Sequence, residues 1–140
     1  MMGTSRIKPI LFSLGLLAVG GWLGAFAGER FAIYRGGIAS EAICIQANEA
    51  FYAKDLSRAE LLAFEAIPLD PGSYLPYVEL GDVFSQRSET AAAINAYSLA
   101  LQKLTANKGH YHVVRHLDPS LRQQELGQLR DKIAKLKMRV

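Results

Sequence analysis

Small or apolar residues recur through the middle of this chain at a fixed spacing of 34 residues. The pairs that share this spacing are Ala47 with Gly81, Ala59 with Ala93, Ala63 with Tyr97, and Ala66 with Ala100. A fixed period in the range of about 20–50 residues is typical of stacked helix-turn-helix units, which bury their apolar faces only against neighbouring units. We therefore expect an all-α fold in which two helical hairpins pack side by side.

The predicted helices of the two hairpins cover about residues 40–53, 57–67, 74–86 and 89–107. Ser40 can cap the first of them, after a flexible joint at Gly36 and Gly37. Pro68 and Pro71 end the second helix, because proline lacks the backbone N–H that a helix needs. Turns fall at residues 54–56 and 87–88.

One more helix is predicted from Pro119, with Asp118 as its N-cap. Its apolar residues step by three and four positions and are Leu126, Leu129, Ile133, Leu136 and Val140. Such a narrow stripe suits a helix that covers the open side of the second hairpin. The basic residues in 132–139 either complement the helix dipole or meet anionic lipid, and the first reading needs no partner.

The residue types at matching offsets point to a known repeat. The second copy carries Tyr77, Leu80, Gly81, Phe84, Ala93, Tyr97 and Ala100. At these offsets it resembles the tetratricopeptide repeat (TPR). The first copy resembles it more loosely, through Ala47, Phe51, Ala59, Ala66 and Asp70-Pro71. The resemblance covers about residues 40–107 and implies an α-solenoid that binds other proteins.

The resemblance also implies a protein-binding groove lined by the first helix of each repeat. Its residues here are Cys44, Asn48, Phe51, Tyr52, Val78, Asp82, Ser85 and Gln86. Asn48 matches the TPR domains that clamp a C-terminal carboxylate, but Cys44 stands where they have lysine, so a clamp is not expected. The groove suits one helix or a short extended peptide, unless the chain's own last helix fills it.

Residues 9–28 form an uncharged apolar run. As a helix this run would span about 30 Å, the thickness of the hydrocarbon core of a bilayer. We expect a retained membrane anchor. The alternative is a cleaved secretory signal, since Arg6 and Lys8 precede the run and residues 25–27 read Ala-Phe-Ala. The charge bias places the N-terminus in the cytoplasm and the repeats across the membrane, in the periplasm of a bacterium.

Small residues Gly20, Gly24 and Gly28 recur every four positions in this run. On a membrane helix they would share one face, where a partner helix can approach to backbone distance. The alternative is that glycine is simply common in membrane helices.

Composition narrows the function classes. The net charge is +3, and the basic residues lack the aromatic interleaving of a nucleic-acid surface. No catalytic trio, glycine-rich phosphate loop or CxxCH haem site is present in the sequence, so neither an enzyme nor a cofactor is expected.

The single cysteine, Cys44, is expected to pack as a small apolar residue. His110, His112 and His116 are read as surface or packing residues rather than metal ligands or a pH-sensitive contact.

Together these patterns predict four regions: an anchor at 1–28, an interfacial linker at 29–39, two TPR-like hairpins at 40–107, and a connection with a capping helix at 108–140. The leading hypothesis is a single-pass, membrane-anchored interaction subunit, a scaffold or assembly factor that binds other subunits of a membrane complex. The alternative is a secreted or periplasmic chaperone-like binder with residues 1–27 removed.

Overall fold

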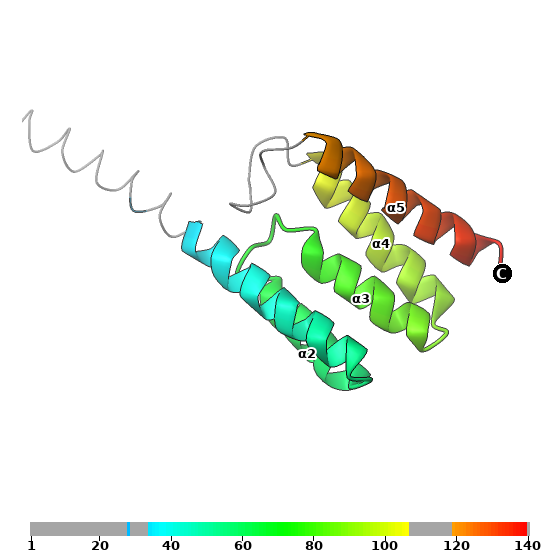
Figure 1. Cartoon of the computed structure of the whole chain (residues 1–140), viewed down its shortest axis with the longest axis horizontal. Coiled ribbons are helices and arrows are strands. Elements are labelled where there is room, and N and C mark those ends of the chain that lie inside the picture. The colour runs from blue at the N-terminus through cyan, green and yellow to red at the C-terminus, as the bar shows by residue number, and fades with distance from the viewer. Residues whose placement is uncertain (1–27, 29–33, 107–118, 140) are drawn as a thin grey trace, which may run out of the picture. The chain divides into compact units, whose positions relative to one another are not determined.

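The computed structural model describes residues 28, 34–106 and 119–139, and every regular element in these ranges is a helix. Helical residues 34–52 are followed by α2 (Leu56–Ala66), α3 (Leu75–Gln86), α4 (Thr90–Ala106) and α5 (Pro119–Lys137) (Figure 1). The predicted all-α class is confirmed for this part of the chain. The helices from α2 to α5 lie where the apolar spacing predicts them.

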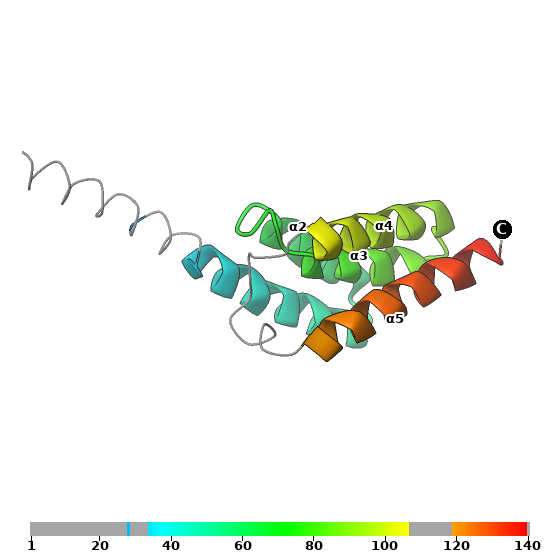
Figure 2. The ribbon, with the colours of Figure 1, turned by 90° about the horizontal axis from the view of Figure 1, so that it is seen from above.

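Contacts divide the chain into two compact units, Met1–Tyr34 and Arg35–Val140. Within the second unit α2 packs on α3, α3 on α4, and α4 on α5. Figure 2 shows the helix at 35–52 and α5 along the lower side of the unit and α2 and α4 along its upper side. The second unit is therefore a stack of helices that are neighbours in the sequence.

The repeat in the sequence is also a repeat of the backbone. Lys54 and Ser88 occupy equivalent positions of the two copies, and both adopt positive φ angles, of 67° and 65°. Each sits in the short turn between the two helices of a hairpin. The backbone N–H groups that donate across these turns, with their acceptor carbonyls, are Lys54 to Phe51, Asp55 to Ala50, Ser88 to Ser85 and Glu89 to Phe84. The two hairpins thus share one turn geometry.

Small side chains let the paired helices approach closely. The fully buried alanines at repeated positions are Ala47, Ala59, Ala63, Ala66, Ala93 and Ala100. A Cβ atom added at Gly81 would overlap the ring of Tyr97, which is 2% exposed. Glycine is therefore required where α3 crosses α4, because the aromatic ring occupies the space that a side chain would need.

The last helix covers the second hairpin through the predicted apolar stripe. Leu129 and Leu136 are buried, and Leu126 and Ile133 pack against the same cluster, which α4 and α3 complete with residues such as Tyr97 and Val78. The outward positions of α5 are polar apart from isolated residues. Val140 and Asp118, which also belong to the predicted helix and its cap, lie outside the described residues.

Two predictions about the first helix are wrong. Gly36 and Gly37 do not form a joint, and Ser40 is not an N-cap, because the helix runs through all three residues. A Cβ atom at Gly36 would overlap the carbonyl oxygen of Leu69, so this glycine permits close packing against the turn after α2. The buried Ser40 hydroxyl donates to the Ala66 carbonyl at 3.0 Å, which satisfies an acceptor at the end of α2.

In the described ranges no helix is both long and apolar enough to cross a membrane. The predicted anchor at 9–28 lies outside these ranges except for Gly28. The predictions on Gly20, Gly24 and the three histidines also concern residues outside them.

Candidate functional site

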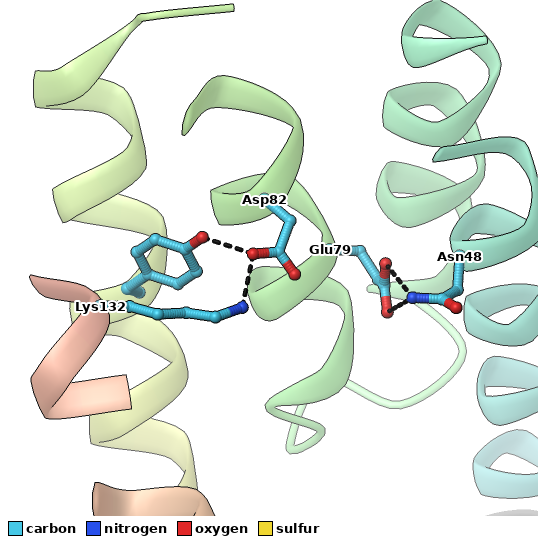
Figure 3. A network of polar contacts seen from close by, with 5 residues as sticks. Asn48, Glu79, Asp82 and Lys132 are labelled. Atoms are coloured by element: carbon cyan, nitrogen blue, oxygen red, sulfur yellow. Dashed lines mark hydrogen bonds and ion pairs between the residues drawn. The ribbon is translucent and has the colours of Figure 1, made fainter. Parts of the chain in front are cut away.

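A group of polar side chains surrounds α3, the helix at the centre of the stack (Figure 3). Asp82 is directed toward α4 and α5, where its Oδ1 accepts from the Tyr97 hydroxyl at 2.5 Å and from Lys132 Nζ at 2.5 Å. Lys132 Nζ also lies 5.1 Å from the centroid of the Tyr97 ring. One carboxylate therefore joins three helices through charge-assisted hydrogen bonds, which are stronger than neutral ones.

The Tyr97 hydroxyl is held in its protonated form. Burial raises its pKa above the ordinary value, and the hydrogen bond to the Asp82 carboxylate and the negative charge of that group raise it further. Tyr97 is thus a structural donor rather than an acid that titrates near neutral pH.

On the opposite side of α3, Glu79 is directed toward the first helix (Figure 3). Both of its carboxylate oxygens face the same Asn48 amide nitrogen, at 3.4 and 3.5 Å. These distances are long for hydrogen bonds, and Glu79 is only 9% exposed. Burial raises the pKa of Glu79 to about 7, although Asn48 opposes the shift. A buried carboxyl with one weak donor therefore changes its charge close to neutral pH.

Cys44 lies nearby on the first helix and is 4% exposed. Burial raises the pKa of its thiol to about 12, and the negative charges of Glu79 and Glu41 add to that effect. Since the thiolate is the reactive form, Cys44 has the properties of a packing residue rather than a nucleophile. This agrees with its predicted apolar role.

The structure separates the predicted groove residues into two groups. The residues committed to contacts inside the chain are Cys44, Asn48, Phe51, Val78 and Asp82. Tyr52 is 73% exposed and Gln86 is also exposed, while Ser85 is half-buried. Lys132 of α5 reaches Asp82, so the chain's own last helix occupies part of the predicted groove.

The sequence patterns did not point to Ile38 and Ile45, which join the predicted groove residue Tyr52 in an exposed feature of the first helix. Ile38, Ile45 and Tyr52 are 48%, 56% and 73% exposed. Their seven-residue spacing places them on one helix face, and the buried residues Ser40 and Ala47 belong to the opposite face. We call these three exposed residues the exposed stripe. The spacing itself was the signal that could have revealed it.

Metal binding has no support in the described residues, since no group of three or more His, Cys, Asp or Glu side chains there is placed to hold an ion. His110, His112 and His116 lie outside those ranges, so the prediction about them stays a prediction. Compared with known proteins, the chain matches no protein-family model, no curated protein and no solved structure.

Proposed function

We propose that this chain is a membrane-anchored, non-catalytic subunit that binds other proteins, built from two TPR-like hairpins and a capping helix. The observation that carries the proposal is the repetition of the hairpin turn at equivalent positions of the two copies, with positive φ at Lys54 and Ser88. A backbone that repeats together with buried alanines at matching positions supports the resemblance to TPR proteins. Solenoid repeat proteins bind partners through the extended surfaces that their stacked repeats create.

The chemistry of Tyr97, Cys44 and Asp82 supports a structural role for these three residues. Tyr97 and Cys44 have raised pKa values because they are buried, which removes them as a base or a nucleophile near neutral pH. Asp82 is held by Tyr97 and Lys132. The polar groups around α3 thus hold helices together.

The proposed anchor is the uncharged run at residues 9–28. A segment of this length and composition suits one passage through the bilayer. The charge bias of its flanks favours a cytoplasmic N-terminus and a helical domain on the opposite side. Anchoring would confine the domain to the membrane surface and raise its effective concentration near membrane partners, which is why we propose a scaffold or assembly factor of a membrane complex.

Fractionation tests this proposal. The full chain should stay with membranes through a carbonate wash, keep residues 1–27 by mass spectrometry, and migrate with other subunits after extraction in mild detergent. A mature chain that begins at Gly28 and is recovered from the aqueous fraction would support the secreted binder instead. A chain that keeps residues 1–27 but migrates alone in detergent would contradict the role as a subunit.

A further inference from the structure

The first helix is held to the rest of the stack mainly by small side chains. Its buried residues are Ser40, Cys44, Ala47 and Ala50. Phe51 adds a half-buried ring. The later helices bury larger side chains, such as Tyr97, Leu104 and Leu129. Since the free energy gained on burial is roughly proportional to apolar area, the first helix is the part of the described stack that detaches at the lowest cost.

A carboxyl group lies inside this interface. Glu79 of α3 faces the first helix, and the Asn48 amide nitrogen is its one hydrogen-bond donor among the described residues, at 3.4 and 3.5 Å from the two oxygens (Figure 3). An ionised carboxylate only accepts hydrogen bonds, so this single weak donor leaves it poorly satisfied. A protonated carboxyl matches the amide better, because its O–H can donate to the Asn48 oxygen while the amide donates in return. The contact therefore suits the neutral acid.

The other groups around Glu79 do not supply the missing compensation. From the first helix it faces Cys44, whose thiol stays protonated because its pKa is raised to about 12. Asp82 on α3 repels the negative charge of Glu79, and Lys132 of α5, which attracts it, is already bound to Asp82. The Tyr97 hydroxyl of α4 stays neutral because its pKa is raised, and α2 meets α3 through apolar side chains. Burial therefore dominates and raises the pKa of Glu79 to about 7.

We propose that Glu79 is a pH-sensitive latch, which holds the first helix against α3 while it carries a proton and releases the helix when it ionises. The released state would uncover the faces of α2 and α3 that the first helix covers, among them Ala59 and Val83. An apolar surface would thus become accessible as the pH rises through neutrality. The inference goes beyond the proposed function and does not depend on the membrane anchor.

Cys44 can report the opening, because it is the only cysteine of the chain and is buried in the same interface. The full chain, purified in mild detergent, is mixed with 4,4′-dithiodipyridine, and the labelling rate is followed by absorbance between about pH 5.5 and 8.5. A free thiol also reacts faster as the pH rises, since the thiolate is the nucleophile. Each rate is therefore divided by the rate of Glu79→Gln at the same pH, which keeps the thiol and the histidines but removes the titration of Glu79.

The ratio of the wild-type rate to the Glu79→Gln rate should rise by at least about tenfold across this range. The reason is that the closed state keeps its proton up to about pH 7, whereas the released carboxyl has its ordinary pKa of 4.5. Glu65→Gln, at an exposed position of α2, should reproduce the wild-type profile.

A second variant keeps the test independent of the folding of Glu79→Gln. With rates divided by those of the urea-unfolded chain, Asn48→Ala should extend the rise to higher pH, because Asn48 is the donor that favours the ionised form. Labelling should also depend only weakly on urea below the unfolding transition, since release of one helix exposes less surface than global unfolding.

Two outcomes would overturn the inference. A ratio that stays constant with pH would show that Glu79 does not control the first helix. A urea dependence as steep as that of global unfolding would show that the reagent reaches Cys44 only when the whole stack unfolds. Because neither result depends on how the chain fractionates or which proteins accompany it, the inference and the proposed function can fail separately.

Discussion

The first helix and α5, at the two ends of the described stack, differ in the residues that they expose on their outward faces. α5 buries Leu129 and Leu136 and turns a largely polar side outward, with exposed residues such as Gln124 and Lys135. The first helix buries Ala47 but leaves its stripe uncovered. Among the described residues, the outward face of the stack is therefore largely polar at α5 and carries apolar side chains at the first helix.

The strongest way to test this comparison is to remove similar side chains from the two ends. Leu129→Ala should lower the free energy of unfolding by about 2–5 kcal/mol, since it opens a cavity beneath α5. Ile45→Ala should change it by less than about 0.5 kcal/mol, because Ile45 is exposed. Urea unfolding of the full chain, followed by circular dichroism, measures both. Similar losses from the two variants would show that the first helix also relies on its outer face.

The stability of the contact between the first helix and α3 depends on pH through Glu79. Its folded-state pKa is raised from 4.5 to about 7, so the folded protein keeps a proton that the unfolded chain has already lost. The protonated Glu79 therefore contributes to the free energy of unfolding below about pH 4.5, and this contribution is lost as the pH rises toward 7. The total loss is up to about 3 kcal/mol, because each unit of pKa difference corresponds to about 1.4 kcal/mol.

Urea unfolding between pH 4.5 and 8 checks this prediction in the wild type and in Glu79→Gln. The difference between their free energies of unfolding should change across this range, because glutamine cannot ionise. A constant difference would mean that Glu79 is already charged in the folded state. Glu65→Gln, at an exposed position of α2, serves as the control.

Glycine-to-alanine substitutions should have opposite signs at the two ends. Gly36→Ala places a methyl group against the Leu69 carbonyl and should destabilise the fold by about 1–3 kcal/mol. At Gly127 in α5 an added Cβ meets no atom within 4 Å. Gly127→Ala should therefore stabilise the protein by about 0.5–1 kcal/mol through helix propensity. Thermal unfolding reports both changes, and a neutral Gly36→Ala would argue against close packing at the turn after α2.

The smallest expected effect concerns the ion pair that fastens α5 to α3. Lys132→Met removes the charged partner of Asp82 but keeps the tyrosine hydrogen bond, so a loss of about 1 kcal/mol or less is expected for this partly exposed pair. Faster amide exchange in α5 should accompany it. Lys135→Met, at an exposed position of the same helix, should leave the exchange rates as they are.

Local sequence patterns predicted most of the stack. The apolar period and the prolines placed the ends of α2, α3 and α4 close to where the structure has them. The start of the first helix was predicted wrongly, because glycine normally indicates a break in a helix. At Gly36 it instead accommodates Leu69, a neighbour distant in the sequence that no local pattern reveals.

The site was harder to predict than the helices. The groove positions came from resemblance, which cannot show that Lys132 reaches across to Asp82. Glu79 is an acidic residue, so the apolar pattern did not include it. Its register with Pro76 and Val83 nevertheless places it on the buried face of α3. The exposed stripe has a signal in its seven-residue spacing, but exposure depends on the absence of a covering helix in the described part of the fold.

Site-specific photo-cross-linking in native membranes tests most directly whether the open end is the binding end. A photoreactive residue replaces Ile45 in one variant and Gln124, on the outer face of α5, in another. The account predicts that position 45 forms a cross-link to another protein in the membrane fraction, and that position 124 forms none. Cross-links of equal yield at both positions, or at position 124 alone, would contradict it.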